Sequence, residues 1–487
     1  MTTGFAGWAR PRRRLWLILG LGLGLQGCTT PEPPRVAPLE VPSAWMTPAG
    51  QAPLVADWWS AFGDPVLDRL VAEALERNLD LRQAVARLAE ARALASAQRG
   101  SALPSLDFGA AGARSRTISP ATGKPYDATS HEQLFSAAYE VDLWGRVASL
   151  TAAAASDEQA TQAARSAVAL GVAAQVASAY IGLRQLDAQL DLARRTLVSR
   201  EKSLALTRAR ENRGYGSLLE TAQAEAELRA TAQQIPQIEF AAQRLERALN
   251  VVLARAPGAV ERGRPLLELM PGQLPDTGLP SALMRRRPDI ASAEFQVAAA
   301  DARLAAQRAQ LLPSLNLAAS IGAAGSTILQ GDPFTVWSLG GSVLAPLFNG
   351  GRLRALVEAS ASRRDQALIG YERTVLTAFS EVETQLAALA SQRAQLVQAE
   401  AEQLALGRAL AIAERRYQTG YASYLDALLA QRNLFAVELQ VIGLHAELLT
   451  TQIGLYKALG GGWDADAGNS NPRWPLAAAP SASAAAR

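Results

Sequence analysis

Asn78-Leu79-Asp80-Leu81 opens an alanine-rich helical run that ends in Leu103-Pro104-Ser105-Leu106, and this pattern recurs farther along the chain. Arg287-Pro288-Asp289-Ile290 opens the second run, which ends in Leu312-Pro313-Ser314-Leu315. Two more pairs of blocks follow in the same order: Gly145-Arg146 with Gly351-Arg352, and Gly214-Tyr215-Gly216-Ser217 with Gly420-Tyr421-Ala422-Ser423. This order predicts a duplicated unit whose copies bury their apolar faces against each other.

The first residues have the pattern of a secretory signal. Four arginines between residues 10 and 14 precede the apolar run 15–25, which ends in Gln26-Gly27-Cys28. A basic region, a short apolar region and small residues before a cleavage site form a signal peptide, and the run is too short to span a bilayer. We therefore predict a signal over residues 1–27. Cys28 is the only cysteine, which excludes an intramolecular disulfide.

Leu25-Gln26-Gly27-Cys28 also resembles a bacterial lipobox. This resemblance implies that the mature chain begins at a lipid-modified Cys28. Thr29 follows the cysteine, where an aspartate would favour retention at the inner membrane, so the resemblance implies the outer membrane. The alternative is a soluble secreted protein with an unmodified cysteine.

Composition favours a helical protein that does not bind nucleic acid. The signal carries four of the 48 basic residues and none of the 45 acids, so the mature chain has 44 basic residues (48 − 4) and a charge near −1. The sequence also has no basic patch with interleaved aromatic residues of the kind that binds nucleic acid. Apolar residues make up 49% of the chain and aromatic residues only 6%, because much of the apolar content is alanine, which favours helix.

The chain divides into five segments. Residues 28–56 contain seven prolines and predict an extended tether, while residues 464–487, rich in Ala, Pro, Ser and Asn, predict a disordered tail. Between them lie the two copies of the repeat, 57–262 and 263–463. The duplication favours two intertwined halves over two separate domains.

Each copy contains a long helical segment followed by a return helix. Residues 148–213 and 353–418 lack proline, and each stretch forms a rod on the order of 100 Å if it is helical throughout. A short Gly/Tyr/Ser turn follows each rod. Pro236 is expected to interrupt and kink the first return helix, whereas the second, 424–459, has no proline. Helices of this length favour coiled-coil packing of two helical hairpins.

Four segments alternate in the manner of strands: about 104–116, 132–143, 313–323 and 335–347. In the second segment one face carries Phe135, Ala137, Tyr139, Val141 and Leu143. In the fourth segment one face carries Trp337, Leu339, Val343, Ala345 and Leu347. Serine and acidic residues occupy the opposite faces. The pattern fits strands of an outer-membrane barrel, and it also fits two soluble hairpins that pack one face on the helices.

Four strands cannot close a barrel, and an unpaired strand edge is not tolerated in lipid. If these strands span a membrane, several chains must therefore contribute them. Two chains would give eight strands with a filled interior, whereas three chains would give twelve strands and begin to leave a passage.

The mature sequence resembles the TolC-like outer-membrane factors of tripartite efflux systems, in the lipoprotein branch typified by OprM- and NodT-type proteins. The blocks that carry the resemblance are Trp58-Trp59-x-x-Phe62-x-Asp64-Pro65, Arg287-Pro288-Asp289-Ile290, the two Leu-Pro-Ser-Leu junctions, Arg416-Tyr417-x-x-Gly420 with Leu425-Asp426, and the run from Leu455 to Trp463. The resemblance implies a homotrimer with a twelve-stranded barrel in the outer membrane and a long helical barrel in the periplasm. It further implies a periplasmic membrane-fusion adaptor and an inner-membrane pump of the RND type as partners, with no cofactor and no metal.

The resemblance also assigns roles to the hairpin turns. It implies that the turns contact the adaptor through Gly214, Tyr215, Gly216, Ser217, Leu218, Gly420, Tyr421, Ala422, Ser423 and Tyr424. It implies that the periplasmic gate contains Leu425, Asp426, Leu429, Arg432 and Glu220. Related channels often carry an acid where this chain has Leu429, so we expect an apolar closure. We expect the three turn tyrosines to be exposed, and Arg432 to pair with an acid of another hairpin. The glycines also suit helix ends, and Asp426 and Glu220 suit helix N-termini.

Other classes of function fit the sequence less well. The chain has only two histidines, His131 and His445, without metal-ligand spacing, and it lacks a Gly-x-Ser-x-Gly motif and a phosphate loop, so we do not expect an enzyme. A surface lipoprotein with a structural coiled coil and no pore is a second alternative. A duct for type I protein secretion is a third, and it shares the architecture. The lipobox and the final Leu455–Trp463 block favour small-molecule efflux, but no motif specifies the cargo, the adaptor or the pump.

Overall fold

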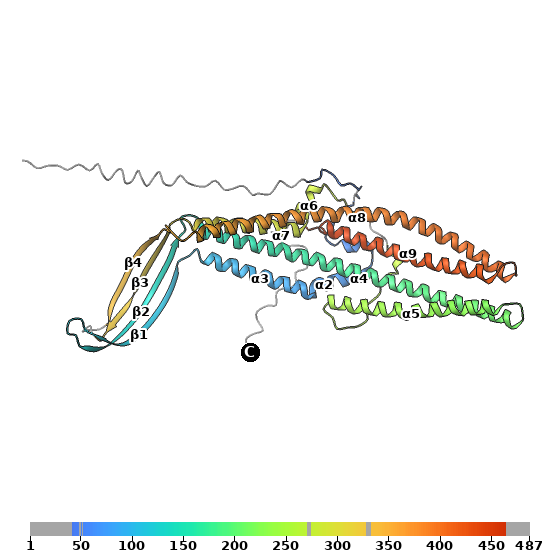
Figure 1. Cartoon of the computed structure of the whole chain (residues 1–487), viewed down its shortest axis with the longest axis horizontal. Coiled ribbons are helices and arrows are strands. Elements are labelled where there is room, and N and C mark those ends of the chain that lie inside the picture. The colour runs from blue at the N-terminus through green and yellow to red at the C-terminus, as the bar shows by residue number, and fades with distance from the viewer. Residues whose placement is uncertain (1–40, 48–49, 51, 270–273, 328–332, 464–487) are drawn as a thin grey trace, which may run out of the picture. The chain divides into compact units, whose positions relative to one another are not determined.

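The computed structural model describes residues 41–47, 50, 52–269, 274–327 and 333–463, which all belong to one compact unit, Leu39–Arg487. The predicted signal peptide, Cys28, the first part of the predicted tether and the predicted C-terminal tail lie outside the described residues. Helices and one antiparallel sheet make up the described chain (Figure 1).

The helices confirm the duplication. The two runs that opened the sequence analysis are α3 (Leu79–Gly100) and α7 (Pro288–Ala309), with 22 residues each. The rods are α4 (Arg146–Asn212) and α8 (Arg352–Gln418), with 67 residues each, and the return helices are α5 (Leu218–Val252) and α9 (Tyr424–Ala458), with 35 each. Shorter elements precede α3 and α7: η1 (Trp58–Phe62), α2 (Pro65–Arg77), η2 (Leu266–Glu268) and α6 (Pro280–Arg286).

The two copies are intertwined. Helix α4 of the first copy packs along α7 of the second copy as well as along α3 and α5, and α8 packs along α7 and α9. Helix α5 continues through Pro236, so the expected interruption of this helix was wrong. Proline removes one backbone hydrogen bond at a cost of about 3 kcal/mol. Packing of α5 against α4 is extensive enough to hold the helix together around that defect.

The four strands form one sheet in the order β1-β2-β3-β4, with every neighbour antiparallel. Their bounds are Ser105–Ile118, Pro125–Val141, Ser314–Ser326 and Phe334–Leu344. Strand β2 therefore begins seven residues before the expected start at 132, since the hairpin pairs Ile118 with Pro125. Strand β4 ends before the expected 347, and Leu143, Ala345 and Leu347 lie beyond the strands. The ends of the strands are determined by backbone pairing, whereas the alternation of apolar and polar residues detects only the apolar part of a strand.

The register places unlike rows of side chains on the two faces of the sheet. Phe108, Phe135, Ile321 and Trp337 are cross-strand partners in one row. The adjacent row on the other face contains Asp107, Ser136, Ser320 and Ser338. The apolar row is exposed in the single chain, where Trp337 keeps 75% of its surface accessible. The soluble alternative required this face to pack on the helices, so its exposure favours contact with lipid.

The main core lies where the two copies meet between the sheet and the hairpin turns. Trp58 is fully buried and stacks on Tyr456 at a ring separation of 5.3 Å, which joins the start of the first copy to the end of the second. The Tyr180 hydroxyl donates to the buried Asp64 carboxylate, which also accepts the amides of Val66 and Arg264. This carboxylate therefore caps α2 and fixes the loop before η2.

Helices α4 and α9 are long and apolar enough in composition to cross a membrane. Core helices of soluble domains have the same property, and 56% and 44% of the two apolar windows are buried inside the fold. Packing between helices therefore accounts for their apolar character.

Candidate functional site at the hairpin turns

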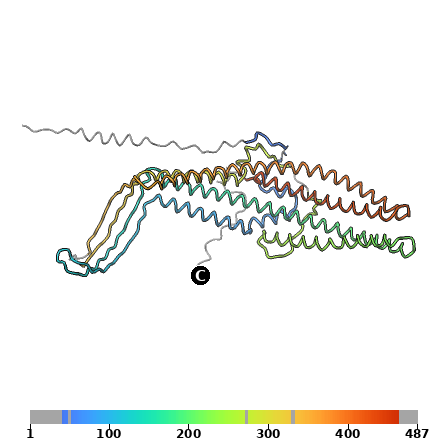
Figure 2. Tube along the Cα trace, in the orientation of Figure 1, coloured from blue at the N-terminus to red at the C-terminus, as the bar shows by residue number. Residues whose placement is uncertain are grey.

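The two long hairpins reverse at turns of the same design, which lie at the same end of the helices (Figure 2). Gly214 follows α4 with φ at 77°, and Gly420 follows α8 with φ at 83°. This left-handed conformation favours glycine at a helix end because it has no Cβ. The Arg210 carbonyl accepts the Tyr215 amide at 2.9 Å, and the Arg416 carbonyl accepts the Tyr421 amide at 2.8 Å.

Two of the three turn tyrosines are exposed. Tyr215 keeps 85% and Tyr421 keeps 80% of its surface accessible, as expected for aromatic side chains available to a partner. Tyr424 is 3% exposed, so its expected exposure was wrong. It is the first residue of α9, and its ring packs on Tyr417 at 5.5 Å. Burial raises the pKa of Tyr424 to about 12.

Serines and one acid cap the return helices. Ser217 Oγ accepts the Leu219 amide at 3.0 Å at the start of α5. At the start of α9 the Asp426 carboxylate accepts both the backbone amide and the hydroxyl of Ser423, at 3.2 Å each. Asp426 is therefore engaged by the N-terminus of its own helix.

Tyr417 joins the ends of the two hairpins. Its hydroxyl donates to Glu220 Oε2 at 3.2 Å, and the Arg210 guanidinium lies 4.3 Å from the centre of its ring. Arg210 also donates to the Gln418 carbonyl at 2.8 Å. The carboxylate expected as a gate acid, Glu220, thus lies at the contact between the two hairpins.

A polar cluster deeper in the bundle connects the same helices. Arg200 of α4 pairs with Glu227 of α5 at 3.1 Å, and Arg432 of α9 pairs with Glu227 at 3.4 Å. Arg432 was expected to pair with an acid of another hairpin, and the observed partner is an acid of the first hairpin in the same chain. Arg200 also donates to the Glu227 carbonyl and to Thr231, and burial lowers the pKa of its guanidinium.

Leu425 and Leu429 share one face of α9 and are both about half exposed, at 47% and 46%. They lie outside the buried cluster that joins the hairpins, which contains Tyr417, Tyr424, Leu204, Ala224, Ala427 and Leu428. An exposed leucine pair beside a buried cluster is available to side chains of another chain.

A groove runs beside this cluster between α4 and the second hairpin. Two connected cavities of about 220 and 280 Å³ share Ser199 and Gln431 in their linings. Gln431 donates to Glu414 at 2.9 Å and to Ser203 at 3.3 Å, so its amide crosses the groove floor from one hairpin to the other. Burial raises the pKa of Glu438 at the other end of the groove.

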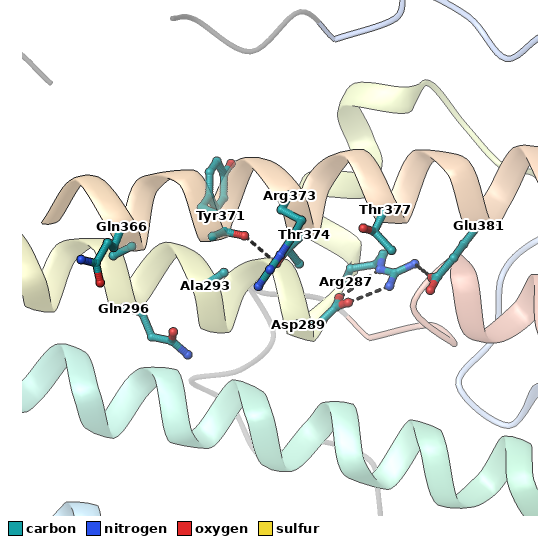
Figure 3. A pocket seen from close by; sticks show the side chains of 12 residues that line it. Arg287, Asp289, Ala293, Gln296, Gln366, Tyr371, Arg373, Thr374, Thr377 and Glu381 are labelled. Carbon is teal, nitrogen blue, oxygen red and sulfur yellow. Dashed lines mark hydrogen bonds and ion pairs between the residues drawn. The ribbon is translucent and has the colours of Figure 1, made fainter. Parts of the chain in front are cut away.

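A second polar site anchors α7. The Arg287 guanidinium is 7% exposed and lies between the Asp289 and Glu381 carboxylates, at 2.6 Å from each (Figure 3). It also donates to the Ala458 carbonyl at the end of α9. Burial opposes ionisation of Asp289, but the hydrogen bonds from Arg287 outweigh it and hold the pKa of this carboxyl below its usual value. Arg287 therefore ties together α7, α8 and α9 beside a pocket of about 460 Å³.

Sequence reasoning missed several of these residues. Tyr417 stood in a recognised block without a role, while Arg200, Arg210 and Glu227 had no local signal, because their partners are distant in sequence. Within the described ranges, histidine, cysteine and acidic side chains form no group of three or more that would hold a metal ion.

Comparison with known proteins identifies the family. The model of the outer membrane efflux protein family matches residues 70–255 and 279–461, which lie within the two copies of the repeat. The chain belongs to this family of outer-membrane proteins, and the helices form its large periplasmic part. Its fold class, a mainly helical chain with four strands for an outer-membrane sheet, agrees with that membership.

Curated relatives give the same result. The chain is 34% identical over 461 residues to the pyoverdine export outer membrane protein OpmQ of Pseudomonas putida, covering 92% of this chain and 97% of the relative. It is 36% identical to the toluene efflux pump outer membrane protein TtgI of the same species, covering 82% and 86%.

Solved channels share the fold. The outer-membrane channel OprN superposes with a TM-score of 0.83 at 28% identity, covering 89% of this chain and 98% of that one. The outer membrane channel MtrE of Neisseria gonorrhoeae, solved in its open state, superposes with a TM-score of 0.78 at 29% identity, covering 88% and 98%.

Proposed function

We propose that three copies of this chain form a passive conduit without catalytic activity, through which a tripartite pump exports small molecules across the outer membrane. The observation that carries the proposal is the sheet. It has one apolar and one polar face, and strands β1 and β4 form its two edges. Edges in lipid must be paired, and pairing β4 of one chain with β1 of the next closes twelve strands from three chains.

Light scattering of detergent-extracted protein tests the assembly, since it measures the mass of the complex without its detergent. We expect three times the mass of the mature chain. A monomer or a dimer would contradict the proposal, because four or eight strands leave no passage. Conductance in planar bilayers then distinguishes a pore from a surface lipoprotein with a structural coiled coil.

The partners are proposed from the hairpin turns. A membrane-fusion adaptor docks on the exposed turns that carry Tyr215, Leu218 and Tyr421, and the contact extends to the groove lined by Ser199 and Gln431. The adaptor connects this channel to an inner-membrane pump of the RND type. Crosslinking through a photoreactive residue at position 421 tests the contact, and position 240 on the exposed face of α5 is its control.

The gate is proposed to combine an apolar closure with a polar link. Leu425 and Leu429 of three chains meet at the axis, while Glu227 holds the second hairpin to the first through Arg432. Binding of the adaptor separates the hairpins and weakens that link. Glu220 contributes through Tyr417, and Asp426 contributes by shaping the start of α9.

The cargo is proposed to be small molecules rather than proteins. Relatives that cover 82–92% of this chain are named for export of pyoverdine, solvents and toluene. A type I secretion duct remains the competing function, and deletion of the gene separates the two. Loss of resistance to drugs or solvents supports efflux, whereas loss of a secreted protein without any change in resistance supports the duct.

A further inference from the structure

Two arginines stand on the apolar face of the sheet, beyond its apolar rows. Arg114 and Arg116 belong to β1, and they lie six and eight residues after Phe108 on the same side. The pairing of β1 with β2 is continuous from Ser105 to Ile118, so no bulge transfers these side chains to the other face. Both are exposed, at 77% and 73% of their side-chain surface.

Their height in the membrane follows from the strand geometry. Arg114 pairs with Thr129, which lies 12 residues along β2 from Val141 (141 − 129) in the apolar row nearest the helices. Twelve residues rise about 40 Å along a strand, or about 30 Å across the membrane at a tilt near 40°. The apolar band of such a barrel is about 25 Å tall. Arg114 and Arg116 therefore stand just above it, at the level of the outer-leaflet headgroups.

The charges around the pair leave cationic groups available. Asp127 lies on the same face, 3.9 Å from Arg114 and 4.0 Å from Arg116. These separations are too long for hydrogen bonds, and exposed pairs of this kind contribute at most about 1 kcal/mol. Among the residues that the structure describes, His131 is the other titratable side chain near the pair on this face of β1 and β2, Lys124 in the adjoining turn adds a further positive charge, and Glu132 lies on the opposite face. Two guanidiniums thus share one carboxylate, which leaves a net positive charge and free N–H donors.

We infer that Arg114 and Arg116 bind the phosphate groups of an anionic glycolipid, lipid A, in the outer leaflet. This inference rests on the proposed membrane-spanning barrel. Guanidinium and phosphate form paired, charge-assisted hydrogen bonds. The apolar row containing Phe108 and Trp337 lies six residues, or about 20 Å along the strand, below Arg114, which is within reach of the acyl chains of the same lipid. A free phosphate ion would gain only the first of these two contacts.

Native mass spectrometry of the detergent-purified assembly tests the inference. The probes are bisphosphorylated lipid A, lipid A without phosphate, phosphatidylethanolamine and inorganic phosphate. We expect bisphosphorylated lipid A to bind at least about tenfold more tightly than the other lipids, which is about one charge-assisted contact. Inorganic phosphate at the same concentration should not displace it.

Matched variants locate the site. Arg114→Gln with Arg116→Gln should weaken lipid A binding about tenfold or more. The control, Arg229→Gln with Arg247→Gln, removes two exposed arginines of α5 and should leave binding unchanged. Arg114→Lys with Arg116→Lys keeps the charge but removes the paired hydrogen bonds, so its affinity should fall between those of the wild type and the glutamine variant. If the glutamine variant fails to assemble, the lysine variant is the test, and an unchanged affinity in it contradicts the inference.

Equal binding of the phosphorylated and phosphate-free lipids by an intact assembly overturns the inference while the channel proposal stands. Equal losses of lipid A affinity in the β1 variant and in the α5 control overturn the inference as well. Displacement by inorganic phosphate indicates an anion site that does not need the membrane, and this also contradicts it. If light scattering shows an assembly that is not a trimer, both the proposed channel and this inference are contradicted.

Discussion

Arg287 shows how one residue of the duplicated sequence acquires a role that its counterpart lacks. Asp289 and Asp80 occupy equivalent places near the start of α7 and α3, but Asn78 stands where the second copy has Arg287. Asn78 caps α3 by accepting the Leu81 amide, whereas Arg287 pairs with two acids and joins three helices. The same helix start is thus held by a cap in one copy and by an ion-pair network in the other.

The Asp289→Asn variant should be less stable by about 2 kcal/mol near neutral pH, because it removes charge-assisted hydrogen bonds to a buried guanidinium. The folded pKa of Asp289 lies below its usual value of 3.8. Its contribution is therefore present above that value and is lost as pH falls through the folded pKa. Thermal unfolding of both proteins from pH 7 to pH 3 measures the difference. Asp80→Asn is the control, and a loss as large in that variant would contradict the assignment to Arg287.

Closure by leucine side chains predicts a distinct conductance phenotype. Leu425→Ser with Leu429→Ser should raise single-channel conductance in planar bilayers and admit large antibiotics such as vancomycin. Asp426→Ala should do less, since Asp426 is engaged by Ser423, and should instead destabilise the start of α9 by about 1 kcal/mol. If the alanine variant opened the pore and the serine variant did not, the closure would be electrostatic.

At the scale of elements, the hairpins owe their association to buried contacts between helices far apart in sequence. Tyr417 and Tyr424 of the second hairpin lie in one buried cluster with Leu204 and Ala224 of the first. Arg432 reaches Glu227 across the same boundary. The end of each hairpin is therefore fixed by the other hairpin as well as by the hydrogen bonds of its own turn.

Glu227→Gln should raise the open probability of the channel several-fold. The substitution breaks the pair with Arg432, worth at most about 1 kcal/mol at an exposed site, and leaves the buried Arg200 without its carboxylate. Glu225→Gln is the matched control, because among the described residues Glu225 forms ion pairs only with Arg208 and Arg229 of the first hairpin. Equal effects of the two variants on bilayer recordings would exclude Glu227 as a link between the hairpins.

The sheet makes an independent prediction. Phe135→Arg places a charge on the lipid-facing side and should cost about 2–4 kcal/mol if it lies near the midplane. Ser136→Arg places the same charge on the polar face, so it should assemble at a yield closer to that of the wild type. The measurement is the yield of heat-stable assembly in outer-membrane fractions. Similar yields for both variants would argue against a membrane barrel.

At the scale of the whole molecule, we expect two attachments to the membrane: the barrel and a lipid at Cys28. Mass spectrometry of the mature N-terminus should find acylated cysteine, and Cys28→Ser should remove the acyl groups. Membrane insertion should persist in that variant, because the closed barrel is sufficient to anchor the protein in the membrane. An intact Met1 or a free thiol at Cys28 in the mature protein would refute the anchor.

The sequence alone determined the duplication, the two long hairpins, their glycine turns and the existence of four strands. These features depend on local patterns: helix periodicity, left-handed glycines and alternation along a strand. The family also followed from the ordered blocks. Strand limits did not follow, because β2 extends through polar residues such as Asp127 and Ser130 that only the register with β1 reveals.

Only the tertiary structure decided which side chains of the turns are free and which are engaged. Tyr215 and Tyr424 both lie in the Gly/Tyr/Ser turn segments of the sequence. In the fold Tyr215 is exposed, whereas Tyr424 is buried against Tyr417. The contacts of Glu227 and Arg287 join segments separated by up to 205 residues (432 − 227). Such pairings depend on how the two copies intertwine, and no short-range pattern records that packing. The fold therefore gives the two copies of the repeat different contacts.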